Sequence, residues 1–599
     1  MKYEPTTIIS EIDNGLRKHD KEVLIATKRK GKWVETGKKE FQEKVRNFAL
    51  GLYELGLRKG DRISLHSENN TEWVICDQAI LSIGAVNVPI YTTQPADQIK
   101  FILENSAARV HIVSNDELFV ETKQLMKSIT NIEAVISIFG SRHKKLKTFD
   151  EILEKGAKKH QENPQLFEQL KSDIHPNDLA TLIYTSGTTG DPKGVMLTHN
   201  NIASNLLASL ERVPFGDEVR EQERMLSYLP LSHVFERLIT YMYLSMGYPI
   251  YYIEEIEKIR EDFEHVKPYY FATVPRLLEK IYTGIKVKGQ ELSGLKKQLY
   301  YWAINMAEEY EPENPPKGLA AVKRGIADKL VYSKIRDLFG GNLLGVVSGG
   351  AALSPSLFRF MNGIGLICLQ GYGLTETSPV ISVNDKDNLR VGSSGKPLSN
   401  VEVKIADDGE IWTKGPHVMV GYFNNEEKTK EVMAEGGWFK TGDVGKMEDG
   451  YLFITDRKKS VFKLSTGKYI APQTIENSLA ESGYIDQAVV IGYSRKFCSA
   501  LIIPNYDNVK KRLAGKGKPL TGDLSKSEKV RELIQREVDK VNSRLSPWET
   551  IKKFALLEEP FSIESGEITP TMKVKRPVVQ ERYKNEIESM YANQEKVIN

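Results

Sequence analysis

Helical and strand-like spacings of apolar residues alternate along most of this chain. Apolar residues recur at helical spacing over residues 45–55 and at strand spacing over 63–66. A helical spacing at 73–81 is likewise followed by a strand spacing at 85–90, and the same order of helix and strand recurs within 99–113. Repeated alternation of helix and strand predicts α/β layers with largely parallel sheets.

The pattern of predicted helices and strands changes near residues 456–460. A strand-like segment at 450–454 runs into Asp456-Arg457-Lys458-Lys459, and a smaller unit of mixed helices and strands follows, in which Ser527 is expected to cap a helix. We predict an α/β fold with a large N-terminal domain of layered mixed sheets and helices, a hinge and a small α+β C-terminal domain. The predicted ranges are 1–456, 457–460 and 461–599, with a charged helical insertion at about 285–338.

The run from Tyr184 to Gly194 carries the clearest candidate chemistry. It contains two glycines before Gly194, several hydroxyls and Lys193, and it lies between a strand-like segment (179–183) and a helix-like segment (201–213). Glycines let backbone N–H groups approach an anion closely, while hydroxyls and a lysine add donors and charge. The run therefore predicts a polyphosphate-binding loop, although its spacing is not the Walker pattern.

Composition narrows the class of protein. Hydrophobic residues make up 40% and charged residues 27%, and 83 basic against 80 acidic residues leave a net charge of +3. This balance disfavours a nucleic-acid binder. Three isolated cysteines without metal spacing indicate a reducing compartment and buried thiols. The N-terminus shows no signal-peptide pattern, and no apolar run is long enough to span a membrane, so a cytoplasmic protein is expected.

Four further motifs follow the phosphate loop in order: Gly371-Tyr372-Gly373-Leu374-Thr375-Glu376-Thr377, Thr441-Gly442-Asp443, Asp456-Arg457-Lys458-Lys459, and Pro570-Thr571-Met572-Lys573-Val574-Lys575-Arg576. Together they resemble the adenylate-forming superfamily of acyl-CoA synthetases, luciferases and adenylation domains over about residues 20–585. The segment from Leu229 to Arg237 and the segment around Thr571-Met572-Lys573 are similar to the long-chain fatty acyl-CoA synthetase branch.

The resemblance implies a reaction of ATP, Mg²⁺, a fatty acid and CoA. A carboxylate attacks the α-phosphate to give acyl-AMP and pyrophosphate, and the CoA thiol then displaces AMP. The resemblance also implies a nucleotide site, made of a phosphate loop (Thr185, Ser186, Gly187, Thr188, Thr189, Gly190, Lys193), an adenine slot (Gly349, Gly350, Ala351, Gly371, Tyr372) and ribose contacts (Asp443, Arg457).

Catalytic roles follow from the same resemblance. Glu376 is expected to ligate Mg²⁺, and Thr375 to touch the α-phosphate. Lys573 would neutralise the charge that grows as the carboxylate attacks. His233 would lie where the acyl and CoA sites meet, although a lone histidine is more often part of a core.

A mobile C-terminal domain is also implied. Lys459 matches the hinge about which this domain rotates between the two half-reactions. After rotation the loop that contains Ser465 and Gly467 would line the pantetheine channel.

Several alternatives remain open at this stage. The aromatic stretch from Tyr241 to Tyr252 could line an acyl tunnel or simply be core. The acyl group could stay as acyl-AMP or pass to a carrier protein instead of CoA, and a catalytically silent binder or a kinase would also hold a nucleotide. The sequence leaves open a monomer or a homodimer, and a peripheral contact with the inner membrane surface.

Overall fold

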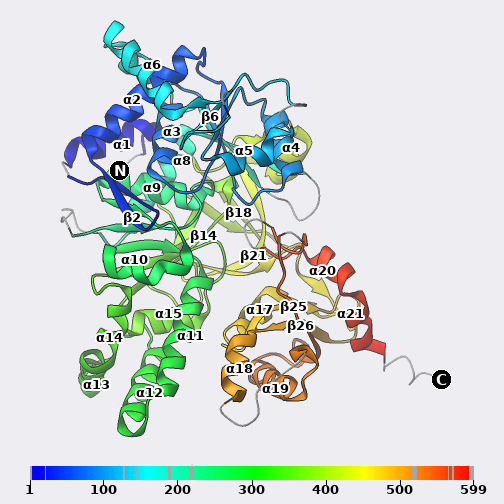
Figure 1. Cartoon of the computed structure of the whole chain (residues 1–599). Helices are drawn as coiled ribbons and strands as arrows, with labels where there is room; N and C mark the ends of the chain where they lie inside the picture. The colour runs from blue at the N-terminus through cyan, green and yellow to red at the C-terminus, as the bar shows by residue number, and fades with distance from the viewer. Residues whose placement is uncertain are drawn as a thin grey trace.

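The computed structural model describes residues 3–19, 22–125, 128–143, 145–185, 191–215, 222–514, 523–563, 565–569 and 573–592. Figure 1 shows a large domain that holds most of the chain and a small domain made by its last part. This agrees with the predicted fold class. The large domain contains sheets of nine, eight and five strands within these residues.

The nine-stranded sheet has the order β16-β15-β14-β13-β12-β10-β11-β1-β2. Its inner strands are parallel, and antiparallel strands lie at both edges. The strands are β1 (Ile25–Arg29), β2 (Lys32–Thr36), β10 (Met225–Ser227), β11 (Ile250–Tyr252), β12 (Tyr270–Thr273), β13 (Gly345–Ser348), β14 (Ile367–Gly373), β15 (Val380–Val383) and β16 (Lys396–Pro397).

The eight-stranded sheet has the order β19-β9-β8-β4-β3-β5-β6-β7 and is mostly parallel. Its strands are β3 (Arg62–His66), β4 (Val86–Ile90), β5 (Val110–Val113), β6 (Ala134–Ser137), β7 (Lys147–Thr148), β8 (Leu179–Thr185), β9 (Lys193–Thr198) and β19 (Gly421–Tyr422). The third sheet contains β17 (Glu402–Ile405), β18 (Glu410–Lys414), β20 (Met433–Ala434), β21 (Trp438–Glu448) and β22 (Tyr451–Arg457).

A strand that the sequence reading did not predict follows the phosphate-loop run. β8 is followed by β9, which pairs with it antiparallel, and then by α8 (His199–Leu210). In β9 the side chains of Val195 and Leu197 are buried, and Met196 between them is only partly buried. This alternation is a strand pattern. The run therefore connects the two strands of a hairpin.

Helices cover the sheets. They are α1 (Ile8–Lys18), α2 (Lys38–Glu54), α3 (Thr71–Ser82), α4 (Ala96–Ser106), α5 (Asp116–Lys123), α6 (Phe149–Glu162), α7 (Leu166–Ser172), α9 (Val234–Met246), α10 (Ile259–Val266), α11 (Pro275–Glu291), α12 (Gly294–Glu308), α13 (Leu319–Ala327), α14 (Ser333–Arg336), α15 (Pro355–Gly363) and α16 (Glu426–Val432). Short turns lie at η2 (Ile256–Lys258), η3 (Asp328–Tyr332), η4 (Asp337–Phe339), η5 (Thr375–Thr377) and η6 (Glu435–Gly437). The segment 285–338 is mostly helical, with a non-helical break at residues 309–318.

The small domain packs helices on a sheet of β25 (Ile485–Ile491), β26 (Cys498–Pro504) and β27 (Ile551–Leu556). Its remaining elements are β23 (Phe462–Lys463), β24 (Tyr469–Ile470), α17 (Pro472–Ala480), α18 (Tyr506–Ala514), η7 (Leu524–Lys526), α19 (Glu528–Asn542), α20 (Arg576–Arg582) and α21 (Lys584–Tyr591). Ser527 does occupy the N-cap position of α19, but its hydroxyl makes no capping bond, so that expectation was wrong. All three cysteines are free and buried, as expected.

A buried ion pair joins α3 to α9. The Arg237 guanidinium contacts the Asp77 carboxylate, and both side chains are almost completely buried. The guanidinium also donates to Tyr241 Oη at 2.6 Å and to Thr181 Oγ1 at 2.7 Å, and Tyr241 Oη donates to Asp77 Oδ2 at 2.6 Å. The contacts of Arg237 therefore stabilise the core of the large domain.

Replacing Arg237 by methionine will lower the free energy of unfolding of the large domain by about 3–5 kcal/mol, because Asp77 would keep a buried, uncompensated charge. Urea unfolding followed by tryptophan fluorescence measures this, since Trp73 lies 5.8 Å from the guanidinium. Lys44→Met is the control, because the Lys44–Glu40 pair is largely exposed and should contribute under about 0.5 kcal/mol. A loss for Arg237→Met as small as that of the control would contradict this role.

Across the described ranges, no helix combines the length and the apolar character needed to cross a bilayer.

Candidate functional site

The predicted adenine slot lies at the carboxyl ends of two neighbouring parallel strands. Residues 349–351 directly follow β13, and Gly371 and Tyr372 lie near the end of β14, which pairs with β13. Ligands of open α/β sheets commonly bind at this edge. A Cβ on Gly349 would come within 3.0 Å of the Phe235 ring, and Gly350 has a φ of +76°. A side chain at Gly349 would press on the Phe235 ring, and one at Gly350 would strain the backbone, so glycine is favoured at both positions.

The predicted ribose ligands meet at the same place. Asp443 is buried on β21, and its two carboxylate oxygens are 2.7 Å from Tyr372 Oη and 3.0 Å from Arg457 Nε. Arg457 stands opposite Asp443 on β22, and its side chain is half exposed. Burial, followed by the neighbouring Asp443 charge, raises the pKa of Tyr372 well above its usual value. Tyr372 therefore stays a neutral hydrogen-bond donor to the carboxylate.

Glu376 and Lys193 are joined by a tyrosine that the sequence reading did not single out. Tyr422 Oη donates to Glu376 Oε1 at 2.9 Å, and Lys193 Nζ lies 4.9 Å from the centre of the Tyr422 ring. Tyr422 is held on β19, which pairs with β9 beside Lys193. Desolvation and the charge of Lys459 lower the pKa of Lys193. The only sequence feature that could have drawn attention to Tyr422 is its place next to Gly421 in a strand-like segment.

Lys573 is the residue that the small domain contributes to this site. Its amine interacts with Arg457, Asp443 and Glu376 of the large domain. Lys573 is exposed to solvent, yet protein surrounds its amine closely enough that desolvation, followed by the Arg457 charge, lowers its pKa. The amine therefore stands among the predicted ribose and magnesium residues.

His233 lies at the edge of the same cluster. It is the N-cap of α9, where its Nδ1 accepts from the backbone N–H of Phe235 at 3.2 Å. Desolvation, followed by the charge of Lys573, lowers the pKa of His233 to about 4. The imidazole is therefore neutral near pH 7.

Part of the predicted phosphate loop lies outside the described residues, namely Ser186, Gly187, Thr188, Thr189 and Gly190. The two ends of the loop are described. Thr185 closes β8 and pairs with Lys193 at the start of β9. Thr375 begins the turn η5, next to Glu376.

The predicted hinge follows β22 directly. Lys459 is exposed in a turn, and its charge is felt by Lys193. The neighbouring Lys458 binds Asp408 Oδ2 at 2.6 Å and Glu410 Oε2 at 2.9 Å. These contacts hold the start of the linker against the large domain.

The two domains also meet away from the linker. The guanidinium of Arg276 on α11 pairs with the carboxylate of Asp486 in the small domain and donates to the Asp486 carbonyl at 2.7 Å. Any rotation of the small domain must break these contacts.

The structure does not bring the predicted pantetheine loop into the cluster. Ser465 and Gly467 are exposed, and their backbone N–H groups donate to the carbonyls of Arg495 and Leu464, within the small domain. Lys573 and this loop thus occupy different positions relative to the large domain.

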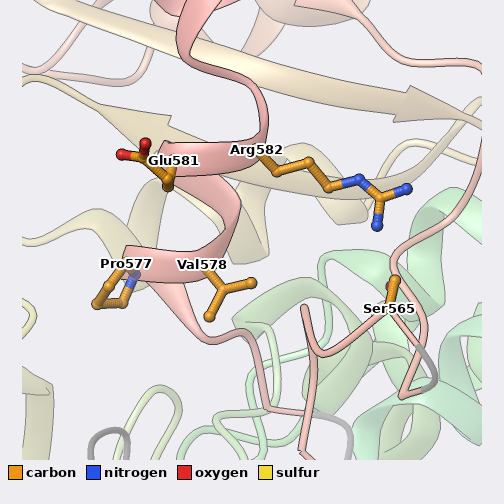
Figure 2. Close-up of a pocket in the computed structure, with 5 residues that line it drawn as sticks. All are labelled: Ser565, Pro577, Val578, Glu581 and Arg582. Atoms are coloured by element: carbon orange, nitrogen blue, oxygen red, sulfur yellow. The ribbon is translucent and has the colours of Figure 1, made fainter.

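A surface hollow of about 530 Å³ lies elsewhere on the small domain. Figure 2 shows Pro577, Val578, Glu581 and Arg582 on α20, with Ser565 on a neighbouring loop. None of the residues predicted for the site lines this hollow, so it is separate from the cluster around Asp443.

Replacing Tyr422 by phenylalanine will reduce kcat/KM for adenylate formation by about tenfold, because a hydrogen bond to a charged carboxylate is lost while the ring beside Lys193 remains. ATP–pyrophosphate exchange with a fatty acid measures this effect. The matched control is Tyr451→Phe, at the far end of β22 from Arg457. An exchange rate equal to that of the wild type would show that Tyr422 does not position Glu376.

Comparison with known proteins identifies the family of the chain. Residues 13–423 match the AMP-binding enzyme family, and residues 459–595 match the AMP-binding enzyme C-terminal domain. The chain is 36% identical over 568 residues to the long-chain-fatty-acid–CoA ligase FadD15 of Mycobacterium bovis, covering 94% of this chain and 93% of that protein. It is 34% identical to the peroxisomal long chain acyl-CoA synthetase 6 of Arabidopsis thaliana, covering 90% and 79%.

Solved structures share the fold. The adenylation domain of a carboxylate reductase from Mycobacterium chelonae superposes with a TM-score of 0.75 at 23% identity, covering 99% of this chain and 92% of that one. The anthranilate CoA ligase AuaEII in complex with anthranoyl-AMP gives a TM-score of 0.73 at 19% identity, with 97% of each chain covered.

The chain therefore belongs to the AMP-binding enzymes, in the branch of the adenylate-forming long-chain acyl-CoA synthetases.

Proposed function

We propose that the chain is an AMP-forming long-chain fatty acid:CoA ligase whose first half-reaction takes place in the cluster around Asp443. The observation that carries this proposal is the position of Lys573. This lysine comes from the small domain, yet its charge acts on Glu376 and Asp443 of the large domain. The similarity to long-chain-fatty-acid–CoA ligases supplies the substrate class and the acceptor.

The first half-reaction requires positioning rather than a protein nucleophile. A fatty carboxylate oxygen attacks the α-phosphorus of ATP, the bond to the β-phosphate oxygen breaks, and pyrophosphate leaves. Negative charge grows around the α-phosphorus in the transition state, so fixed cations and donors there lower the barrier. Lys573 supplies the cation, and Thr375 supplies a hydroxyl to the same phosphate.

The rest of the cluster would hold the nucleotide. The residues at the ends of β13 and β14 form the adenine slot, with the Tyr372 ring as one wall. The Asp443 carboxylate would accept from the ribose hydroxyls, and Arg457 fixes its orientation from the opposite strand. Thr185 and Lys193 would bind the outer phosphates, together with the loop residues between them.

Glu376 fits a magnesium ligand. Magnesium is usually held by one or two carboxylates plus substrate phosphates. Among the described residues no group of three or more potential metal ligands occurs, which suits that mode of binding. Tyr422 bonds Glu376 Oε1 and so orients the carboxylate. Bound magnesium would neutralise phosphate charge there.

In the second half-reaction CoA replaces AMP at the acyl carbonyl carbon. The CoA sulfur forms a bond to the acyl carbon, the bond to the AMP oxygen breaks, and AMP leaves with the electron pair. Rotation of the small domain about Lys459 would withdraw Lys573 and present the loop of Ser465 and Gly467. His233, neutral at the edge of the cluster, would border the incoming thiol.

A product assay tests this function. The purified protein with ATP, Mg²⁺, CoA and palmitate should give palmitoyl-CoA, AMP and pyrophosphate in equal amounts. Acyl-AMP that accumulates without acyl-CoA would instead identify a fatty acyl-AMP ligase or a carrier-protein loading enzyme. ADP as the product would indicate a kinase and overturn the proposal.

We further propose that the enzyme works in the cytoplasm, as a monomer or homodimer, and meets its fatty acid at the inner membrane surface. An amphiphilic substrate favours such a peripheral location, because long acyl chains partition into bilayers.

A further inference from the structure

Large apolar side chains that reach solvent are concentrated on one helical region of the large domain. Leu295 and Leu319 are 83% and 82% exposed, values that are unusual for leucine in a folded domain. The complete set in this region is Leu295, Leu299, Trp302, Leu319, Val322, Ile326 and Leu330. These residues lie on α12, α13 and η3, and we call them the foot surface.

The foot surface consists of regular stripes. On α13 and η3 the exposed apolar residues are 319, 322, 326 and 330, spaced three or four apart, which places them on one helical face. Residues 295, 299 and 302 form a similar stripe on α12. Core contacts come from other positions, such as Ile304 on the opposite face of α12 and Ala327 at the end of α13. The exposed apolar stripes therefore remain available to something outside the domain.

Basic side chains surround these stripes. Lys296, Lys317 and Lys323 are exposed and form no ion pair with another described residue, and the same holds for Lys329 and Lys334. The helical positions of Lys323 and Lys329 fall on either side of the apolar stripe of α13.

Most acidic groups of the region are neutralised within the domain. Glu311 pairs with Arg359, and Asp328 with Arg336. Glu313 likewise pairs with Arg390, and Glu308 with Lys286. The outward-facing charge of the foot surface is therefore positive.

We propose that the foot surface docks the enzyme on an anionic lipid bilayer. An amphipathic helix with an apolar face and flanking lysines lies in the membrane interface, with its apolar side chains among the acyl chains and its cations near lipid phosphates. Trp302 suits the same depth, because its ring is apolar and its N–H is polar. Figure 1 shows α12 and α13 at the lower end of the large domain, where a flat surface can reach both.

A second copy of the chain fits this surface less well. A two-fold interface would place the foot surface against itself and bring its lysines together. A bilayer that contains acidic lipids instead pairs every lysine with a phosphate. The docking itself does not depend on the proposed fatty-acid activity. Only its use, access to a fatty acid held in the bilayer, rests on that activity.

Vesicle flotation of the full-length chain tests the proposal. Wild-type protein should float with vesicles of phosphatidylglycerol and phosphatidylcholine, and less with pure phosphatidylcholine or at high salt. The variants L319Q/V322Q/I326Q and K317E/K323E/K329E should each lower the partition coefficient by about tenfold or more. Both variants should keep wild-type activity on octanoate in free solution, but lose activity on palmitate that is delivered in vesicles.

The matched control is V34Q/V120Q, which replaces two exposed valines on β2 and α5 and should float like the wild type. Unchanged flotation of both foot variants would overturn the proposal, as would a wild type that ignores acidic vesicles. The proposal would also fail if the wild type were a dimer that the apolar variant converts to a monomer without any change in flotation. Loss of flotation with normal octanoate activity in the foot variants supports it, whereas a wild type that floats but forms no palmitoyl-CoA would contradict only the proposed function.

Discussion

Replacing Lys573 by alanine will lower the rate of acyl-AMP formation by about 10²–10³-fold, the usual effect of removing one group that stabilises a transition-state charge. The Lys573 amine interacts electrostatically with Asp443, Glu376 and Arg457, beside which the α-phosphate is proposed to bind. The reaction of supplied acyl-AMP with CoA should keep nearly its full rate, because the small domain has then rotated away. ATP–pyrophosphate exchange and single-turnover thioester formation measure the two halves separately.

Lys575→Ala is the matched control. This lysine stands two residues further on, and its backbone N–H bonds the Glu567 carbonyl at 2.7 Å, within the small domain. Its replacement should leave both half-reactions unchanged. Equal loss of both half-reactions in Lys573→Ala would show a general structural defect and contradict the assigned role.

The pH dependence offers a second view of the same amine. Lys573 must be protonated to neutralise charge, and desolvation with the Arg457 charge lowers its pKa. For adenylation by the free enzyme, kcat/KM should therefore fall on the alkaline side at a lower pH than the usual lysine pKa of about 10.4 would give. Lys573→Arg should move this alkaline limb upward, because arginine stays charged.

Replacing Lys459 by proline will slow thioester formation by about 10²-fold while adenylate formation is less affected. Proline fixes φ and removes the backbone N–H, so the turn after β22 would lose the freedom that rotation requires. Small errors of placement suffice for such a loss. The structure has Lys573 in the nucleotide cluster and the loop of Ser465 and Gly467 outside it, so adenylation needs no rotation from this state.

Lys459→Ala separates the backbone from the side chain. It keeps the freedom of the turn and should leave thioester formation near the wild-type rate. If Lys459→Pro also left both half-reactions unchanged, Lys459 would not be the hinge.

Much of the fold could be predicted from apolar spacing. Residues 45–54, 63–66 and 73–81 are in α2, β3 and α3, because buried faces in this part of the chain follow the helix and strand periods. The strand β9 was missed because a helix-like segment follows the loop closely, and the strand contributes only six residues. The cap at Ser527 was also wrong, since a hydroxyl at an N-cap need not bond the helix.

Candidate site residues could be singled out from the sequence where glycines and charges cluster in one short motif, as around Glu376 and Asp443. Contacts between distant segments were not predictable. Tyr422 reaches Glu376 only because β19 pairs with β9, and Arg237, which lies in a family-like motif, turned out to bind Asp77 in the core. Such pairings depend on sheet order, which a single sequence does not specify.

A crystal structure with a stable acyl-adenylate analogue tests the central claim most directly. The Asp443 carboxylate should lie within hydrogen-bonding distance of the ribose hydroxyls, with the adenine beside Tyr372 and Lys573 facing the phosphate position when the small domain is in the orientation described above. An analogue bound in any other cavity, with these residues facing solvent, would contradict it.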